Sequence, residues 1–446
     1  MATFLGTVTN NVVNVPLAQI SGEYHASLAE GVLVVSGFVV VLASVMPVMG
    51  WVSDRFGRRR VLSTALLLLC LGLLAAGTAP SLPALIAARV VQGLACAAIA
   101  PAVMGTLPAL YPPELRARAM SSWAAANGLG QAVGPPLGGV LAGLLGWPWV
   151  FFVLAPLALV TAAGTARLAP PDRGRSSALH WPGAVALTLG AALLMTSFTA
   201  AGENGVASGW IAAMSLAGVG LLAVFVRVSR AAEAPLIPPT LLVETRFLRS
   251  SGAAFVQMAA LVSVLVAVPL YAATRLRLST PQTGLLIFAL PAAMVAGARP
   301  VGRLADRIGA RRVMRGGLAL LAASQACLAA FMWAGASSLP LLAAILVVVG
   351  AGVASVQTPS AAGVTRSPSG QSGASLGLFN MIRFAGAAAG AAWVAATFPS
   401  RSYLLLFLGS GTLVLGGLVL TYLGPDPGGS PGDEPAAEGV EQLRPA

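Results

Sequence analysis

The sequence predicts an all-α integral membrane protein with about fourteen transmembrane helices. Three observations support this fold class. The composition is 57% hydrophobic and only 9% charged, which is far from that of a soluble domain. Apolar runs of about 20 residues, the length that crosses a hydrocarbon core of about 30 Å, follow one another along the chain. A short motif of glycine, acid and arginine occurs twice, once in each half.

The apolar runs are separated by short polar gaps, and this succession sets the expected membrane spans. In the first part of the chain we expect spans at 2–20, 31–52, 61–79, 82–104, 119–145, 148–168, 182–202 and 208–228. In the second part we expect them at 250–272, 282–301, 313–335, 339–361, 374–397 and 403–423. The polar, proline-rich stretch 169–182 is typical of a linker, and 229–250 suits a segment at the membrane interface.

The arginines predict the orientation in the membrane. The sequence has no lysine, so arginine alone reports the positive-inside rule. If the N-terminus is cytoplasmic, only Arg275, Arg277 and Arg401 are left for the external loops. This asymmetry fits an even number of spans. We therefore expect a multi-pass protein of the inner (plasma) membrane with both termini in the cytoplasm.

Several function classes are excluded by the residues themselves. The net charge of +12 does not point to nucleic acid, because the arginines form no basic stripe beside stacking aromatic residues. Cys70, Cys96 and Cys327 each fall inside an apolar run, away from any disulfide or metal-ligand spacing. No nucleophile, base and metal constellation gathers in one place. We expect no enzymatic activity, no cofactor and no metal site.

The repeated motif falls at two expected cytoplasmic turns, from Gly50 to Arg60 and from Gly302 to Arg312. Such duplication is typical of a transporter built from two related halves. Glycines permit a tight turn, while the acid and the arginines can cap helix ends and pair across the halves. We interpret the two copies as a conformational latch. Its residues are Gly50, Asp54, Arg55, Gly57 and Arg58 in the first copy, and Gly302, Asp306, Arg307 and Gly309 in the second.

An alternative for this motif stays open. The arginines could serve only as topology determinants, and Asp54 only as a helix cap. The recurrence of the acid in both halves favours the latch.

Further segments carry a resemblance to a known family. Residues 85–98, with Arg89, Gln92 and Gly93, look like a fourth-helix motif, and residues 130–139, GQAVGPPLGG, look like a fifth-helix antiporter motif. Together with the repeated turns, and with 147–152 and 377–383, they resemble the major facilitator superfamily, specifically its drug/proton antiporter branch with fourteen spans. The resemblance covers the chain from the first helix to the last.

The resemblance implies a division of the chain into four parts. We expect a six-helix bundle at 1–168, a linker with two inserted helices and an interfacial segment at 169–249, and a second six-helix bundle at 250–423. The tail at 424–446 is rich in Gly, Pro and Glu. It cannot bury enough apolar surface to order itself, so we expect it to be disordered.

Charged residues within the spans are the first site candidates. Arg89 and Arg383 fall inside expected helices, where an unpaired cation is costly. Arg89 is shallow enough that it could instead snorkel to the external interface. No carboxylate lies mid-membrane, and Thr9 stands where the family's first-helix motif usually has an aspartate. We nominate Glu30, at the external end of the second span, with Arg89 as the protonation pair.

The fifth-helix motif and the neutral polar residues supply the remaining candidates. Gly134, Pro135, Gly138 and Gly139 let a neighbouring helix approach and let their own helix bend, which suits a gate or simply close packing. For the substrate cavity we nominate Asn14, Gln92, Gln131, Asn380 and Arg383.

The resemblance implies a secondary active transporter that exports small amphipathic molecules, such as drugs or natural products, by alternating access in exchange for protons. Because arginines but no carboxylates lie within the spans, a neutral or anionic substrate is favoured over a cation. Two alternatives remain: an uncoupled facilitator or importer of the same fold, and a membrane scaffold or sensor that does not transport. We expect a monomer in the lipid bilayer with no nucleic-acid partner.

Overall fold

The chain is an all-α membrane protein, as the sequence predicts. The computed structural model describes residues 1–111, 115–172, 174–175, 178–201, 208–367, 370–397 and 402–424. Within these ranges there is no strand, and 13 helices are long and apolar enough to cross a membrane. The expected disorder of the tail concerns residues that, apart from Gly424, lie outside the described ones.

The helices follow the expected spans closely. The first part of the chain contains α1 Ala2–Asn11, α2 Leu17–Glu23, α3 Leu28–Phe56, α4 Arg58–Gly77, α5 Leu82–Thr106, α6 Arg116–Leu145, α7 Trp149–Phe152 and α8 Leu154–Leu168. Two inserted helices follow, α9 Trp181–Ala200 and α10 Ser208–Ala231. The second part contains α11 Thr245–Thr274, α12 Thr280–Ile308, α13 Ala310–Trp333, α14 Leu339–Thr365, α15 Gly373–Thr397 and α16 Tyr403–Leu420. Short 3-10 helices lie at Leu107–Leu110 and Pro239–Val243.

The first expected span, 2–20, is broken into two helices. α1 ends at Asn11, and α2 begins after Pro16. Proline has no N–H to donate to the carbonyl of Val12, and α6 lies against that carbonyl, because a Cβ on Gly138 would be only 2.0 Å from it. The prediction of one continuous first helix is therefore wrong, because a proline and a close neighbour interrupt the backbone hydrogen bonds there.

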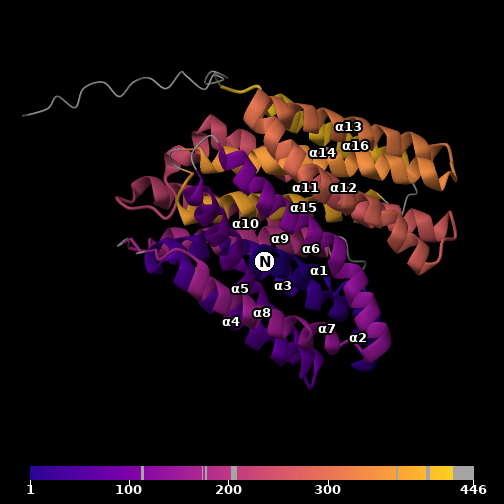
Figure 1. The fold of residues 1–446 in the computed structure, drawn as a ribbon, viewed down its shortest axis with the longest axis horizontal. Coiled ribbons are helices and arrows are strands. Elements are labelled where there is room, and N and C mark those ends of the chain that lie inside the picture. Colours follow the sequence, from indigo (N-terminus) through magenta and orange to yellow (C-terminus); the bar gives the residue numbers. More distant parts are fainter. Residues whose placement is uncertain are drawn as a thin grey trace, which may run out of the picture.

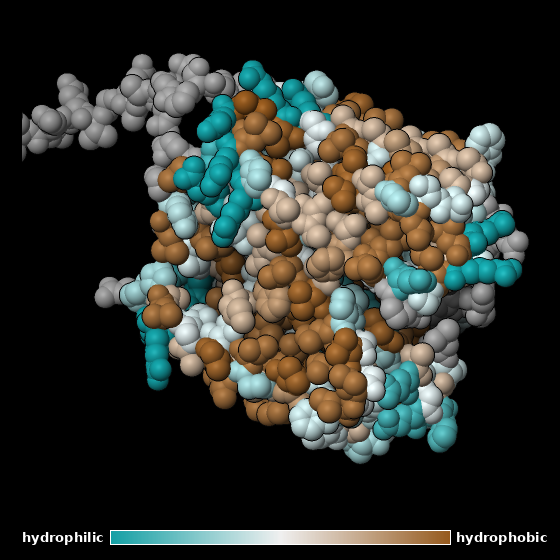
Figure 2. Space-filling view, turned by 45° about the vertical axis from the view of Figure 1, so that its right-hand side comes forward, coloured by the Kyte–Doolittle hydropathy of each residue, from teal (hydrophilic) through white to brown (hydrophobic). Residues whose placement is uncertain are grey.

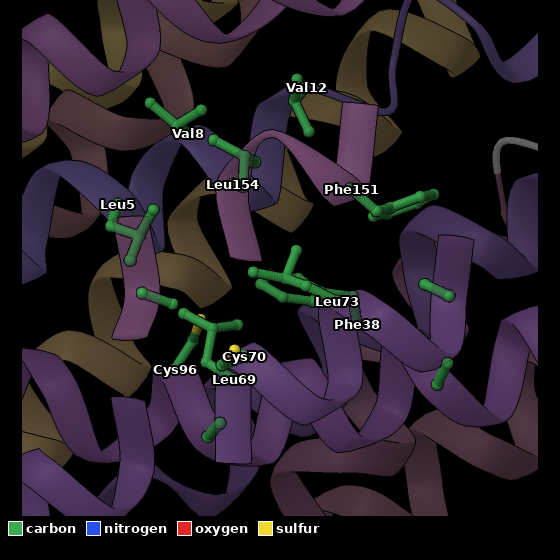
Figure 3. Packing of buried hydrophobic residues seen from close by; sticks show 14 of the residues in the cluster. Leu5, Val8, Val12, Phe38, Leu69, Cys70, Leu73, Cys96, Phe151 and Leu154 are labelled. Carbon is green, nitrogen blue, oxygen red and sulfur yellow. The ribbon is translucent and has the colours of Figure 1, made fainter. Parts of the chain in front are cut away.

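The helices form two groups, each with its own apolar core. In the first group, side chains from α1, α3, α4, α5 and α8 turn towards one another, among them Leu5, Phe38 and Leu73 (Figure 3). In the second group, α11–α16 enclose a core that includes Tyr271 and Phe407. Figure 1 shows the second group, in salmon, orange and yellow, lying beside the first, in indigo, violet and magenta. Each core gains stability from dense van der Waals packing, because lipid is as apolar as these side chains and burial alone contributes little.

A third apolar cluster joins the two groups. It includes Met104 of α5, Trp123 of α6 and Phe379 of α15. We call the contacts of α3, α5 and α6 with α12, α14 and α15 the seam. The inserted α9 packs on both α3 and α15, while α10 packs on α9 and leaves most of its own surface exposed. The inserted hairpin therefore covers one side of the seam.

The surface agrees with a position in lipid. Hydrophobic side chains cover most of the face in Figure 2, and hydrophilic side chains gather towards its left and right margins. The exposed hydrophobic residues include Leu71, Leu144, Val160 and Leu216. A broad apolar band between polar ends matches the hydrocarbon layer and its two interfaces.

Candidate functional site

Asp54, in the last turn of α3, joins the two halves of the molecule. Its Oδ2 accepts a hydrogen bond of 2.5 Å from the N–H of Gly373, the first residue of α15. Its Oδ1 accepts a bond of 3.3 Å from Arg58 Nη2. The first N–H groups of a helix lack backbone partners and carry positive partial charge. Asp54 therefore caps a helix of the opposite half.

The backbones of α3 and α15 touch beside this cap. A Cβ on Gly50 would lie 1.8 Å from the carbonyl oxygen of Gly373, and a Cβ on Gly377 would lie 2.3 Å from that of Met46. Neither position has room for a side chain. The seam is therefore closed at the end of the molecule that holds the Asp54 turn.

The Asp54 turn is tied to its own half as well. Gly57 has φ +91°, a conformation that side chains disfavour, and it lets α4 start directly after α3. Arg58 Nη1 donates to the carbonyl of Gly105 at the end of α5, at 2.6 Å. The predicted latch residues Gly50, Asp54, Gly57 and Arg58 thus lie together.

The linker after α8 lies on top of this turn, which sequence reasoning missed. Asp172 Oδ2 accepts a bond of 3.3 Å from the N–H of Arg58, and the N–H of Arg175 donates to the Asp54 carbonyl at 2.8 Å. A Cβ on Gly174 would lie 2.0 Å from the carbonyl oxygen of Arg55. An acid and a glycine within a proline-rich break were the available signal.

The second copy of the motif repeats the backbone but not the contacts. Gly309 has φ +93°, close to the value of Gly57, yet both carboxylate oxygens of Asp306 are shielded from solvent and accept no hydrogen bond. Alignment of the two motifs places Ala310 where the first has Arg58. Arg307 is exposed, and Gly302 is buried. Among the described residues, the cross-half cap therefore involves the acid of the first copy.

The arginine two residues after the positive-φ glycine makes the same kind of hydrogen bond in both copies. Arg59 Nη2 donates to the carbonyl of Ala166 near the end of α8, and Arg311 Nε donates to that of Thr421, just after α16, at 2.8 Å. The last carbonyls of a helix lack backbone donors. These arginines therefore tie the last helix of each half to the helix that follows the motif.

Arg89 holds several helices of the first half together. It is fully buried, and Nε donates to the carbonyl of Val34 in α3 at 3.1 Å. Nη1 donates to the carbonyl of Thr9 in α1 at 3.0 Å and to Gln92 Oε1 at 2.8 Å. Gln92 in turn donates to the carbonyl of Gly72 in α4 at 2.8 Å. Arg89 does not snorkel to an interface, and it supplies a donor to the end of the broken first helix.

Glu30 does not reach Arg89. Its carboxylate accepts bonds of 2.8 Å from both the N–H and the hydroxyl of Ser27, and Ser27 caps the start of α3 in return. No ion pair joins Glu30 to Arg89, although the structure describes both side chains. The two coupling candidates are therefore separate in this conformation.

The glycines of the fifth-helix motif let α6 lie close against the broken first helix. A Cβ on Gly134 would lie 2.9 Å from Asn11 Cβ, and one on Gly139 would lie 3.2 Å from Val15 Cγ1. α6 continues through Pro135 and the next proline without interruption. The geometry shows close packing of α6 on the turn between α1 and α2. A gating role for Gly134, Pro135, Gly138 and Gly139 stays a prediction.

Arg383 lies at the seam with an aromatic partner from the other half. Its side chain is only 2% exposed, and the guanidinium carbon lies 5.2 Å from the ring centre of Trp123 in α6. Nη1 donates to Asn380 Oδ1 at 3.3 Å, while Nε has no hydrogen-bond partner. Asn380 Nδ2 lies 3.1 Å from Met104 Sδ in α5. These residues form a cationic, aromatic-walled contact between the halves.

Two predicted cavity residues, Asn380 and Arg383, are therefore brought together. Gln92 belongs to the Arg89 network instead, and Gln131 donates to Asn127 Oδ1 at 3.2 Å within α6. Asn14 is exposed in the turn between α1 and α2. Sequence reasoning missed Trp123, whose position in a run of small residues was the available signal.

No acidic side chain of the described chain lies in the middle of a spanning helix. Each is at a helix end or in a connecting segment, namely Glu23, Glu30, Asp54, Asp172, Glu233, Glu244 and Asp306. Glu114 and Glu203 lie outside the described residues. Arg89 and Arg383 therefore have no acidic residue at their depth in the described part of the chain.

Known proteins are similar to this chain in sequence and in fold. A transporter of the same type from Mycobacterium tuberculosis, itself described as uncharacterized, is 30% identical over 404 residues, which cover 89% of this chain and 69% of that protein. The drug efflux pump JefA of that organism is 29% identical over 415 residues, 90% and 80% of the two chains. The puromycin resistance protein of Streptomyces alboniger is 33% identical over 241 residues, 53% and 48%.

A solved structure and a family model complete the comparison. The human organic anion transporter MFSD10 superposes with a TM-score of 0.66 at 19% identity, covering 94% of this chain and 98% of that one, which shows a common fold. The model of the Major Facilitator Superfamily matches residues 1–229 and 251–446. With this match over nearly the whole chain, the protein belongs to the major facilitator superfamily and is a membrane transporter by family, not an enzyme.

Proposed function

We propose that this chain exports small neutral or anionic amphipathic molecules, drugs or natural products, by alternating access between its two halves and in exchange for protons. The efflux and resistance functions in the names of the relatives support export. The seam supports the mechanism, because a transporter of this kind rocks its halves about a site between them.

The observation that carries the substrate class is the position of Arg383. A buried cation without an acidic partner is costly, and its Nε lacks any hydrogen-bond partner. An acidic or strongly hydrogen-bonding group of a substrate would satisfy this donor, while the rings of Trp123 and Phe384, 5.2 and 5.7 Å from the guanidinium carbon, would pack on its apolar body. A permanent cation would meet repulsion there.

The closed end of the seam supports a particular conformation. In the orientation that the arginines favour, the Asp54 turn faces the cytoplasm. Contacts from Asp54 to Gly373 and from Gly50 to Gly373 then belong to a state closed to the cytoplasm. In this proposal, the first motif copy holds that state and the rest of the cycle requires Asp54 to release α15.

The organisation proposed for the chain follows the same reasoning. The two rocking bundles are residues 1–168 and 250–423, and the linker with the inserted helices is 169–249. The protein lies in the inner (plasma) membrane, and both of its termini lie in the cytoplasm. We propose that the protein works as a monomer, since one chain supplies both sides of the seam.

One observation favours a second candidate function, an uncoupled facilitator. Proton antiport usually depends on a titratable group that both sides of the membrane can reach. Glu30 is exposed and bonded to Ser27, and it forms no ion pair with Arg89. A facilitator would move its substrate without proton exchange, so the effect of a pH gradient on transport distinguishes the two functions.

The test is transport into inverted vesicles, with and without a pH gradient, across matched anionic, neutral and cationic aromatic compounds. Wild type should transport the anionic and neutral compounds, and a gradient should accelerate them. Arg383→Gln should lose the anionic ones while Arg303→Gln, a change at an exposed arginine, should not. Export of organic cations that is unchanged by Arg383→Gln would overturn the substrate class, and transport insensitive to the gradient would favour the facilitator.

A further inference from the structure

A cavity of about 630 Å³ lies within the second half of the molecule, and neither Arg383 nor Asn380 is among its lining residues. It is formed where α11 and α13 end and α16 begins, which is the end of this half opposite the Asp306 turn. Its lining includes Tyr271, Arg275, Met332, Trp333, Tyr403 and Leu404. This volume falls in the range of small-molecule sites.

Two tyrosines form a fixed aromatic wall of the cavity. Tyr271 and Tyr403 are 2% and 8% exposed, and their rings meet edge to face at 89° with centres 5.2 Å apart. The hydroxyl of Tyr271 donates to the carbonyl of Ala336 at 3.3 Å. Rings held in this way give the cavity a rigid wall, and the small exposed part of each ring can contact a flat or apolar body at little cost in entropy.

Among the described residues that line the cavity, the charged one is Arg275, which follows α11 directly and is exposed. None of these described lining residues is acidic. An arginine beside aromatic rings favours ligands that combine a carboxylate or phosphate with an apolar part.

The first half contains a comparable tyrosine contact. There, the hydroxyl of Tyr24 donates to the carbonyl of Ala79 at 2.7 Å, as Tyr271 donates to Ala336. Trp147 packs on Tyr24 with ring centres 5.8 Å apart, and its indole N–H donates to Glu23 at 2.6 Å. The charged residue beside the aromatic pair is thus an acid in the first half and Arg275 in the second.

We propose that the cavity at Arg275 binds an amphipathic small molecule with one anionic group, whose acid contacts Arg275 and whose apolar body packs on Tyr271, Tyr403 and Trp333. The ligand has either of two sources, a free aromatic acid or the headgroup of an anionic lipid. Neither source depends on the proposed export function, because this cavity is separate from the Arg383 site.

The experiment follows labelling of a cysteine placed in the cavity. Ser337 lines the cavity and is exposed, so Ser337→Cys is made together with Cys327→Ser, which removes the exposed native thiol; Cys70 and Cys96 are buried. The protein is held in phosphatidylcholine nanodiscs, and its rate of reaction with a maleimide is measured. The probe is 2-naphthoate, and its uncharged control is 2-naphthalenemethanol.

Naphthoate should slow the labelling, and the uncharged alcohol should do so far less. Arg275→Gln should weaken naphthoate protection by about tenfold or more, since it removes a charge-assisted hydrogen bond. Arg277→Gln, two residues further and outside the cavity lining, should leave protection unchanged. Leu404→Trp keeps Arg275 but fills the cavity, so naphthoate should no longer slow the labelling further. Loss of protection in both variants would then be due to the cavity and not to a folding defect of Arg275→Gln alone.

A second arm identifies the source of the ligand. Replacing part of the phosphatidylcholine by phosphatidylglycerol, without naphthoate, should slow labelling in an Arg275-dependent way if a lipid headgroup occupies the cavity. If naphthoate alone protects, a free aromatic acid is the ligand. Labelling rates that neither naphthoate nor phosphatidylglycerol changes, or protection that survives Arg275→Gln, would overturn the proposal. Because no transport is measured and Arg383 is intact, this result is independent of the export assay.

Discussion

Asp54 in the first half of the chain accepts a hydrogen bond from the N–H of Gly373, the residue that opens α15 in the second half. The same carboxylate is paired with Arg58, and the backbone carbonyl of Asp54 accepts a hydrogen bond from the N–H of Arg175 in the linker. One residue therefore connects both halves and the segment between them. Its charge, more than its shape, makes this connection, because a helix start attracts an anion.

Asp54→Asn removes this charge while preserving the shape of the side chain. A charge at a helix start is worth about 0.3–1 kcal/mol when exposed and up to about 2 kcal/mol when partly buried. The closed state should lose population accordingly, and transport into inverted vesicles should fall severely at unchanged expression. The matched control is Asp306→Asn, because the Asp306 carboxylate accepts no hydrogen bond and should matter less. Equal transport in wild type and Asp54→Asn would mean that the turn serves topology alone.

The sequence predicts the Asp54 turn but not its partner. Glycine, acid and arginine at fixed spacing mark a tight turn in any chain, whereas nothing near Gly373 marks it as the residue that Asp54 caps. Similarly, a hydrophobic run over 2–20 predicts a span. The break after Asn11 depends on Pro16, which the sequence shows, and on the close approach of α6 at Gly138 to the Val12 carbonyl, which it does not. Contacts between distant segments are decided by tertiary packing, which periodicity does not contain.

Buried charges show the same division between what sequence can and cannot predict. Their depth marks Arg89 and Arg383 as unusual from the sequence. Most of what satisfies them does not follow, because two of the acceptors of Arg89 are the backbone carbonyls of Thr9 and Val34, which every residue possesses. The nearest acid along the sequence pattern, Glu30, caps its own helix instead.

Arg89→Gln should destabilise the first half. The change leaves the buried carbonyl of Thr9, at the broken end of α1, without a donor, and an unsatisfied group of this kind costs about 1–3 kcal/mol. The carbonyl of Val34 loses a second hydrogen bond but keeps its bond within α3. The apparent unfolding temperature, followed by size exclusion of a fluorescent fusion, should fall by several degrees, whereas that of Arg303→Gln should not. An unchanged unfolding temperature would show that these hydrogen bonds do not hold the end of α1.

Gly138→Ala should destabilise the protein by overpacking. The added Cβ would lie 2.0 Å from the Val12 carbonyl oxygen, a backbone atom that cannot move without shifting the first helix, and such strain costs roughly 1–3 kcal/mol. Gly143→Ala in the same helix is the matched control, because no atom lies within 4 Å of its Cβ. If both variants unfold at one temperature, α6 does not press on the broken first helix in the membrane.

Topology is tested by fusing a reporter to the C-terminal end. The arginine distribution predicts that the tail is cytoplasmic, so a reporter that is active only in the cytoplasm should be active there, and one that requires the periplasm should be silent. A second fusion after Gly335, between α13 and α14, should give the opposite pattern, since Gly335 lies at the other end of α13 from the Asp306 turn. A periplasmic signal from the tail would contradict the even number of spans.

Ala310→Arg should create in the second half the ion pair that the first half already has. Arg58 lies four residues after Asp54 and pairs with it at 3.3 Å, and Ala310 lies four residues after Asp306, whose shielded oxygens accept no hydrogen bond. An arginine at this spacing is well placed to reach the acid. It should raise the apparent unfolding temperature, because the new guanidinium donates a hydrogen bond to a shielded carboxylate that accepts none and whose charge otherwise interacts with Arg366 and Arg118.

The Ala310→Arg gain is assigned to the ion pair by a double-mutant cycle. Ala310→Gln adds a long polar side chain without charge and should raise the unfolding temperature less. Combining Ala310→Arg with Asp306→Asn should remove most of the gain, because the new guanidinium then has no carboxylate to pair with. If the arginine stabilises the protein equally with and without the acid, its effect comes from the membrane surface or from other carbonyls. The second copy of the motif would then serve topology and not the latch.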